Sequence, residues 1–233
     1  MHLRTYQHGF TLVEVLIAIS ISAVITSAFY QIFLSQQRSY LVQEQVAAMQ
    51  QNLRTGLYML AREMRSAGFD PNQTGNFGFV IDFAAPNDIF SPDINYATNK
   101  NIIAFTMDSD APGSTTGAVD KIREEQIVYR LNNNLLQRYN AEWTTEGEKW
   151  ETVAANIDAL DFVLVDQNGN VTTNPANVAA VEITLLVRTD EKDKHYTNTQ
   201  LYRNQRGTDI CPSCSNSNYH RRVLTTTIYV RNS

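Results

Sequence analysis

The chain opens with a long, nearly uncharged apolar segment. Between Phe10 and Leu34, 18 of 25 residues are apolar and the only charged side chain is Glu14. A helix that crosses a bilayer needs about 20 mostly apolar residues, so this segment is long enough to span a membrane once. A secretory signal peptide has a shorter apolar stretch that ends in a small-residue cleavage site, and no such site follows here. Arg4 and Arg38 balance each other across the segment, so flanking charge does not predict its orientation.

A helical pattern continues beyond this segment. Apolar residues recur at steps of three or four with polar residues between them, which is typical of an amphipathic helix: Val42, Val46, Met49, Leu53, Leu57, Leu60, Met64 and Ala67. Gly68 suits a left-handed C-terminal cap, and Pro71 cannot continue a helix. Gly56 interrupts the stripe at a cost of about 1 kcal/mol relative to Ala. The pattern predicts one helix over residues 10–67, and two helices with a hinge near Gln36 are the alternative.

The rest of the chain carries strand patterns. Short runs rich in apolar, β-branched and aromatic residues predict strands at residues 79–83, 102–107, 126–131, 135–139, 157–165, 178–187 and 223–230. Asn132-Asn133-Asn134 and Asn168-Gly169 lie between such runs and tolerate positive φ, so we expect a hairpin turn at each. The simplest architecture is α+β, with one long N-terminal helix packed on an antiparallel sheet that forms a head.

Charge and hydropathy narrow the class of protein. The 233 residues carry a net charge of −5, so a nucleic acid is not expected as a partner, because no basic excess neutralises its phosphates. The 43% hydrophobic and 18% charged residues describe an ordinary folded protein rather than a disordered one. The low mean hydropathy of the whole chain would suggest a soluble protein, but it averages an apolar helix with a polar head.

Glu14 is unusual, because an ionised carboxylate deep in an apolar segment costs about 2.5–3.5 kcal/mol. It either lies near the membrane surface, or is protonated, or is compensated by a specific positive partner. The nine residues before Phe10, MHLRTYQHG, are short and polar. If the chain were cut after Gly9, the new amine of Phe10 would lie one helical turn from Glu14.

The sequence Gly-Phe-Thr-Leu-Val-Glu at residues 9–14, followed by a long apolar helix, resembles the class III signal of type IV pilins and type II secretion pseudopilins. In that family a membrane-embedded peptidase cuts between Gly and Phe and methylates the new N-terminus, and the Glu pairs with a neighbour's N-terminal amine. The resemblance implies that Gly9 and Phe10 form the cleavage site, that Phe10 is N-methylated and that Glu14 is the assembly residue. The helix-breaking Pro that major pilins usually carry about 20 residues into the mature chain is absent.

Later patterns sharpen this resemblance. Residues 60–69, the paired runs 126–131 and 135–138, and the ending 221–228 resemble minor pilins of the PilW family and J-type minor pseudopilins. The head is larger than a major pilin would need. The resemblance implies a low-copy subunit at the filament tip or in a complex that primes type IV pilus assembly. A minor pseudopilin of type II secretion and a membrane-anchored domain that never assembles are the alternatives.

The resemblance also implies a division of the chain and a location. Residues 1–9 would be the leader peptide, 10–34 the transmembrane and filament-core helix, 35–68 its amphipathic continuation, and 69–233 the β-rich head. The protein would cross the bacterial inner membrane once with its head in the periplasm, and would later lie at the pilus tip on the cell surface. The partners implied are the prepilin peptidase and N-methyltransferase, other minor and major pilins, and the pilus assembly platform in the inner membrane.

The head offers little further chemistry. Cys211 and Cys214 are three residues apart, and outside the cytoplasm a disulfide is the default for such a pair. A redox site would need the pair between a strand and a helix, and a zinc site would need further ligands, for which His195 and His220 are nearest in sequence. Free thiols are the remaining alternative.

Residues 166–170 resemble the start of a calcium loop. Val171 and Asn177 stand where such a loop uses Gly and Glu, so we expect a turn instead. Acyl-transfer, zinc-protease and phosphate-loop motifs are absent from the sequence. The sequence therefore predicts a non-catalytic head with no cofactor and no metal.

Overall fold

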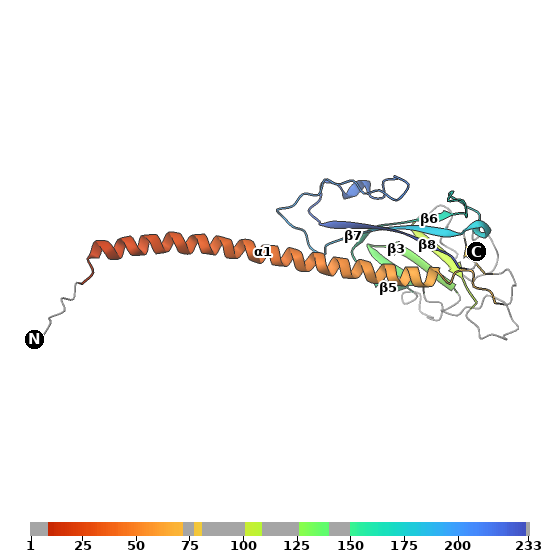
Figure 1. Ribbon diagram of the computed structural model, residues 1–233, viewed down its shortest axis with the longest axis horizontal. Coiled ribbons are helices and arrows are strands. Elements are labelled where there is room, and N and C mark those ends of the chain that lie inside the picture. Colours follow the sequence, from red (N-terminus) through yellow and green to blue (C-terminus); the bar gives the residue numbers. More distant parts are fainter. Residues whose placement is uncertain (1–8, 72–76, 81–100, 109–125, 140–149, 232–233) are drawn as a thin grey trace, which may run out of the picture. The chain divides into compact units, whose positions relative to one another are not determined.

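The computed structural model describes most of the chain (Figure 1): residues 9–71, 77–80, 101–108, 126–139 and 150–231. Residues 1–8 of the predicted leader and residues 81–83 of the first predicted strand lie outside the described residues. Contacts within the chain define two compact units, Met1–Glu44 and Gln45–Ser233, and each is considered by itself.

The predicted N-terminal helix is confirmed as α1, which spans Leu12–Met64. The helix is continuous through Gln36, where the alternative placed a hinge. Gly68 lies four residues beyond the end of α1 and takes a positive φ of 71°, the left-handed conformation that the sequence predicted for it. The N–H of Gly68 donates to the carbonyl of Thr106 at 2.9 Å. The chain that follows the helix is therefore hydrogen-bonded at once to a strand of the head.

Within the first unit, the apolar side chains of α1 are exposed. Leu12 is 76% exposed, Val24 69% and Phe29 67%. Among the described residues, α1 is the one helix that is long and apolar enough to cross a membrane. The predicted membrane-spanning segment, residues 10–34, lies in this part of the helix.

The head contains two antiparallel sheets where the sequence predicted one. The first has the order β1-β2-β3-β4-β5: β1 Phe79–Val80, β2 Ile102–Thr106, β3 Gln126–Asn132, β4 Leu135–Tyr139 and β5 Trp150–Ala154. The sequence did not predict β5. Only Ala154 of this short strand is buried, so its alternation of apolar and polar residues is too weak to stand out.

The second sheet has the order β6-β7-β8: β6 Ile157–Val165, β7 Ala180–Arg188 and β8 Arg221–Tyr229. These strands begin and end within two residues of the predicted ones. A short 3-10 helix, η1, spans Pro175–Asn177 before β7 and was not predicted.

The turns follow the predicted residue chemistry. Asn133 and Asn134, between β3 and β4, have positive φ angles of 49° and 61°, so they form a two-residue hairpin turn. Gly169, after β6, has a φ of 82°. These asparagines and this glycine stand where the backbone needs a left-handed conformation that most residues avoid.

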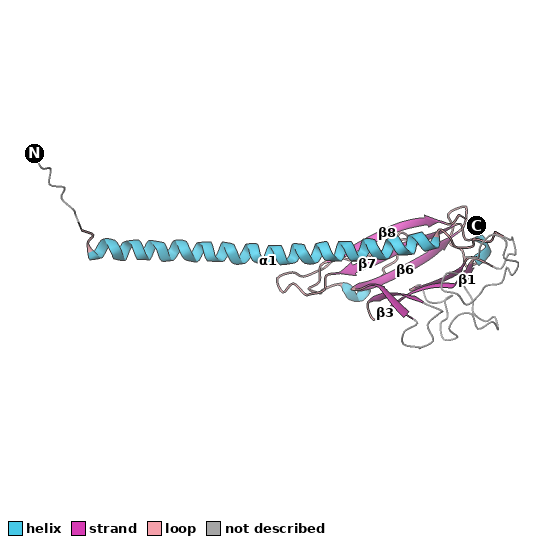
Figure 2. Cartoon of the chain, turned by 90° about the horizontal axis from the view of Figure 1, so that it is seen from below, coloured by secondary structure: helices cyan, strands magenta, loops and turns pink. Residues whose placement is uncertain are grey.

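One apolar core joins the second half of α1 to both sheets. The buried residues of α1 are Met49, Leu53, Gly56, Leu60 and Met64. Four of them belong to the predicted stripe, whereas Gly56, which the sequence predicted to interrupt it, is buried and Leu57 is only half-buried. These four pack with Phe105 and Ile127 of the first sheet and with Leu160 and Ile183 of the second. In Figure 2 this half of the helix runs alongside β7 and β8. The helix thus covers the inner faces of both sheets.

The opposite face of the second sheet is covered by the long connection between β7 and β8. Tyr202, Cys211 and Cys214 of this connection pack on Ala159 of β6 and Leu186 of β7. Figure 1 shows the connection, in blue, on the side of β7 away from α1. The strands β6 and β7 are therefore buried on both faces, whereas β8 is largely exposed.

At Gly56, α1 lies close against the first sheet. A Cβ atom at this position would lie 3.1 Å from the Cβ of Ala154 and 3.2 Å from Cδ2 of Leu136. Both distances are tighter than ordinary van der Waals contact. The interruption of the apolar stripe at Gly56 is therefore a packing requirement, since any side chain would push α1 away from β4 and β5.

We expect Gly56→Leu to lower the free energy of unfolding of the head by about 1–3 kcal/mol, because the added side chain has no space. Thr55→Leu is the matched control, since Thr55 is exposed and its neighbours would accept the same side chain. Urea denaturation of the detergent-solubilised chain measures both. Equal stability of the two variants would contradict the close packing.

A buried ion pair ties α1 to the first sheet. Nε of Arg138 lies 3.0 Å from Oε2 of Glu63, and the side chain of Arg138 is only 5% exposed. The hydroxyl of Tyr129 donates to the same oxygen at 2.7 Å. Burial, and then the nearby Glu63 carboxylate, raise the pKa of the Tyr129 phenol, so Tyr129 stays a donor at any physiological pH.

Removing this carboxylate takes one ion-pair partner from the buried guanidinium of Arg138 and the acceptor from the Tyr129 hydroxyl. We expect Glu63→Ala to lower the free energy of unfolding by about 3 kcal/mol. Arg54→Ala removes an exposed charge from the same helix and should change stability by less than about 0.5 kcal/mol. Thermal unfolding followed by circular dichroism compares the two variants. A loss for Glu63→Ala no larger than that of the control would refute the role of the pair.

Candidate functional site

The start of α1 forms a reciprocal cap. Oε2 of Glu14 accepts hydrogen bonds from the backbone N–H of Thr11 at 2.8 Å and from its hydroxyl at 3.1 Å. The N–H of Glu14 donates in return to Oγ1 of Thr11 at 3.3 Å. This is a capping box, with Thr11 before the first helical residue and Glu14 as the third residue of the helix. The arrangement ties the only acid of the apolar segment to the first turn.

The predicted cleavage site lies just before this cap. Gly9 and Phe10 precede the first helical residue and are exposed. A Cβ at Gly9 would meet nothing within 4 Å. The Gly9–Phe10 peptide bond is therefore open to a second molecule in the described part of the chain. The amine that the sequence pairs with Glu14 would exist only after this bond is cut.

Glu14 leaves one carboxylate oxygen open to a further partner. Among the described residues, every hydrogen bond to the Glu14 carboxylate comes from Thr11 and reaches Oε2. Oε1 can thus accept a donor from outside the described chain while the cap stays intact. Thr11 was missed at the sequence level as a partner of Glu14, although Thr-x-x-Glu before an apolar run is the sequence signature of a capping box.

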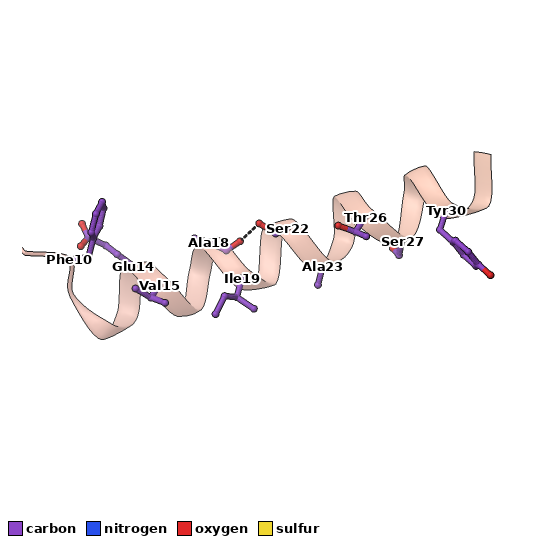
Figure 3. Close-up of a pocket in the computed structure, with 10 residues that line it drawn as sticks. All are labelled: Phe10, Glu14, Val15, Ala18, Ile19, Ser22, Ala23, Thr26, Ser27 and Tyr30. Atoms are coloured by element: carbon purple, nitrogen blue, oxygen red, sulfur yellow. Dashed lines mark hydrogen bonds between the residues drawn. The ribbon is translucent and has the colours of Figure 1, made fainter. Parts of the chain in front are cut away.

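Small residues follow Glu14 along one side of α1 (Figure 3). Ala18, Ser22 and Thr26 come at steps of four, so they lie above one another on the helix. The hydroxyl of Ser22 donates to the carbonyl of Ala18 at 2.7 Å, which satisfies it without water. In a membrane such small residues let a second helix approach closely.

In the head, the structure joins Cys211 and Cys214 in a disulfide within the connection between β7 and β8. The pair brackets the 3-10 helix η2, Pro212–Cys214. Nη1 of Arg221 donates to the carbonyl of Cys214 at 3.0 Å, so the disulfide loop is fastened to the first residue of β8.

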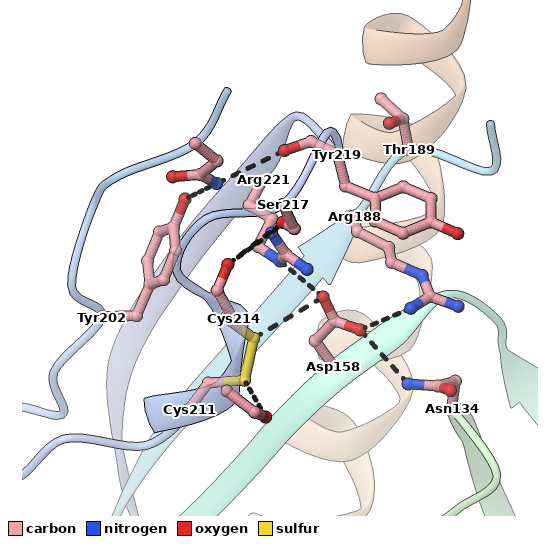
Figure 4. Close-up of polar contacts among 12 residues, drawn as sticks. Asn134, Asp158, Arg188, Thr189, Tyr202, Cys211, Cys214, Ser217, Tyr219 and Arg221 are labelled. Carbon is pink, nitrogen blue, oxygen red and sulfur yellow. Dashed lines mark hydrogen bonds and ion pairs between the residues drawn. A yellow bond between two sulfur atoms is a disulfide. The ribbon is translucent and has the colours of Figure 1, made fainter. Parts of the chain in front are cut away.

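Asp158 also holds the disulfide loop in place, through Arg221 (Figure 4). Its Oδ2 accepts from Nε of Arg221 at 2.6 Å, and its Oδ1 accepts from Nη1 of Arg188 at 3.0 Å and from the amide of Asn134 at 3.2 Å. Asp158, Arg188 and Arg221 belong to β6, β7 and β8, and Asn134 belongs to the β3–β4 turn. The network therefore joins the two sheets to the disulfide loop.

The geometry around Cys211 and Cys214 does not support the alternatives of a redox site or a zinc site. The cysteines lie in a connection between two strands, whereas a redox pair would lie between a strand and a helix. His220 bonds Oδ2 of Asp193 at 3.1 Å and stacks on Tyr196. In the part of the chain that the structure describes, no group of His, Cys, Asp and Glu is arranged to hold a metal ion.

The turn at Asp166 uses its carboxylate for the backbone. Oδ1 of Asp166 accepts from the N–H groups of Asn168 at 2.9 Å and Asn170 at 2.8 Å. These backbone donors, that of Asn170 foremost, hold the pKa of Asp166 below its usual value of 3.8. The carboxylate thus stabilises a turn, as the sequence predicted.

A lowered pKa gives this turn a defined pH dependence. The contribution of Asp166 is complete above its usual pKa of 3.8 and is lost as pH falls through the lower folded value. We expect the amide protection factors of Asn168 and Asn170 to fall below pH 4 in hydrogen exchange. Asp166→Asn is the control, since its amide oxygen still accepts both bonds but does not titrate, so its protection factors should not change. A pH-independent wild-type turn would contradict the assignment.

Comparisons with known proteins agree with these features. Residues 4–30 match the prokaryotic N-terminal methylation motif, which includes the open Gly9–Phe10 bond and the capped Glu14. The fold and this N-terminus define a pilin-like protein that depends on a prepilin peptidase. Residues 42–204 match the family model of prepilin peptidase-dependent protein B, and the chain belongs to that family.

Among solved structures, the chain is similar to a type IV-like pilin from Thermus thermophilus. The two sequences are 11% identical, the match covers 78% of this chain and 95% of that one, and the TM-score is 0.48. Comparison with curated proteins finds no match.

Proposed function

We propose that this protein is a non-catalytic, low-copy minor pilin that helps to start type IV pilus assembly. A prepilin peptidase would cut after Gly9 and methylate Phe10. Residues 10–34 would hold the product in the inner membrane, with the head at residues 69–233 in the periplasm. The subunit would then enter the priming complex or the tip of the filament. Membership of the PilW group of minor pilins is part of this proposal.

One observation carries the proposal: a single capped acid begins a long helix whose first half exposes its apolar side chains. Glu14 is followed by exposed apolar residues as far as Phe33. Lipid can cover such a surface before assembly, and the helices of other subunits can cover it afterwards. A cut between Gly9 and Phe10 would place an amine at the start of each helix. The open Oε1 of Glu14 could then accept that amine from a neighbouring subunit.

The capping box supports the order of these events. Before assembly, Thr11 reduces the cost of keeping the Glu14 carboxylate near an apolar environment, because it supplies two hydrogen bonds. An amine from a neighbour would add a charge that Thr11 lacks. The neighbour's helix is therefore preferred over lipid as the final environment of Glu14.

The head supports a structural role outside the cytoplasm. Members of this family and proteins with this fold are typically structural rather than catalytic. A disulfide between Cys211 and Cys214 persists in an oxidising compartment such as the periplasm. The size of the head favours a subunit present in few copies over one that repeats along the shaft.

Intact mass spectrometry of the membrane-bound protein tests the processing step. We expect the mature chain to lack residues 1–9, a loss of about 1 kDa, and to carry one methyl group on Phe10. Gly9→Val should keep the full mass. An uncut wild-type chain in a cell that makes pili would refute the proposal.

Piliation of a strain that lacks the native gene tests the role of Glu14. Glu14→Gln keeps an acceptor for the capping box but removes the charge, so we expect normal processing and loss of surface pili. Thr11→Ser is the control, because it keeps both the cap and the charge. Normal piliation with Glu14→Gln would overturn the assembly role, and intact pili with failed protein secretion would indicate a type II pseudopilin instead.

A further inference from the structure

The head carries a basic groove between α1 and the end of β8. Its volume is about 520 Å³. Arg54, Arg62 and Arg65 line it from α1, and Arg231 lines it from the residues that follow β8. All four arginines are exposed. The chain as a whole is acidic, with a net charge of −5, so this concentration of positive charge runs against its overall composition.

These arginines have no acidic partner among the described residues. Neither an ion pair nor a side-chain hydrogen bond joins any of the four to an acid in the described part of the chain. Arg62 and Arg65 are three residues apart on one helix, a spacing at which like charges repel by about 0.2–0.5 kcal/mol. The clustering therefore does not help the head to fold.

The helix dipole explains part of the cluster and not the rest. Cations are favoured in the last turn of a helix, which accounts for Arg62 and for Arg65 just beyond the end of α1. Arg54 lies ten residues before that end, where the effect has decayed. Arg231 belongs to no helix. A ligand that carries negative charge explains all four.

The floor of the groove is apolar, which points to a protein rather than a small anion. Leu57, Ala61 and Ile228 line the groove beneath the arginines. Tyr58 also lines it and is 69% exposed. Arg and Tyr are the residue types that most often anchor protein interfaces, and Arg binds carboxylates through two parallel hydrogen bonds. A phosphate or a lipid headgroup would pair with the arginines but would leave this floor and Tyr58 uncovered.

The strand beside the groove is also open on one side. In the described sheet, β8 is the last strand and has β7 as its neighbour. Such an edge can accept the backbone of an extended segment from a second protein. A bound segment could thus contact positive charge and apolar side chains in the groove and backbone groups on β8 beside it.

We propose that this groove binds an extended, acidic segment of a second, different pilin-like subunit, with the carboxylates of the segment on Arg54, Arg62, Arg65 and Arg231. The inference rests on the proposed function, since it assumes a partner subunit. A different subunit is favoured over a second copy, because head-to-tail contacts between copies would propagate without closing and the protein would not stay at low copy number.

Photocrosslinking in the native membrane tests the proposal. Tyr58 in the full-length chain is replaced by p-benzoyl-phenylalanine, and crosslinked peptides are identified by mass spectrometry. The expected product is a peptide rich in Asp or Glu, from a subunit with its own N-terminal methylation motif. Crosslinks only to lipid, only to a second copy, or to nothing would each overturn the proposal.

Charge reversal gives the decisive comparison. Arg54→Glu/Arg62→Glu should lower the yield of that crosslink about tenfold, because two attractive pairs become repulsive. Lys194→Glu/Arg203→Glu makes the same change of charge at exposed positions in the β7–β8 connection, on the other face of the second sheet, and should leave the yield unchanged. Equal yields from the two double variants would refute the groove.

Two further measurements separate misfolding and processing from loss of the contact. Reversal of the acids in the crosslinked peptide to Lys should restore the yield with Arg54→Glu/Arg62→Glu, which a misfolded head could not allow. Failure of this rescue would count against the proposal. The mass of the mature chain is read from the same samples. If the leader is removed normally but the crosslink does not depend on the arginines, the groove assignment fails while the proposed function stands.

Discussion

The close packing of α1 against the first sheet at Gly56 is the contact on which the head depends. A Cβ there would lie 3.1 Å from Ala154 and 3.2 Å from Leu136, so the helix lies too near to β4 and β5 for an added side chain to fit without a shift. This approach lets Leu53 and Leu60 reach the core, one helical turn to either side. It also brings Glu63 to Arg138 and Tyr129. One residue without a side chain therefore sets the position of a whole apolar stripe.

Two carboxylates on α1 have very different partners, and they show that the two halves of the helix differ in what covers them. Glu63 receives a buried guanidinium and a phenol from strands far away in the sequence. Glu14 has only Thr11, three residues earlier, among the described residues. The second half of the helix is completed by its own chain, whereas the first half, exposed along its apolar length, requires lipid or other helices. In the proposed function, this contrast is the physical basis for membrane anchoring before assembly into a filament.

The accuracy of the sequence-based predictions follows the range of the interactions involved. The hairpin at Asn133-Asn134 and the left-handed conformation of Gly68 were predicted correctly, because a positive φ is a local demand. The strand β5 was missed, because a short and half-exposed strand is specified by its pairing with β4 and not by its own pattern. The division into two sheets was missed for the same reason. The Asp158 network was not anticipated either, because it joins residues of three strands and one turn that are far apart in the sequence.

The sequence by itself determined the long helix, its apolar first half, the acid at its start and the order of most strands. These properties depend on the spacing of apolar residues, on composition and on neighbours within a few positions, and all of these can be read from the sequence. Only the tertiary structure decided why Gly56 is tolerated, what Glu63 binds, and that Arg231 joins Arg54, Arg62 and Arg65 in one groove. Those facts depend on residues far apart in the chain, and distance in sequence carries no record of contact in space.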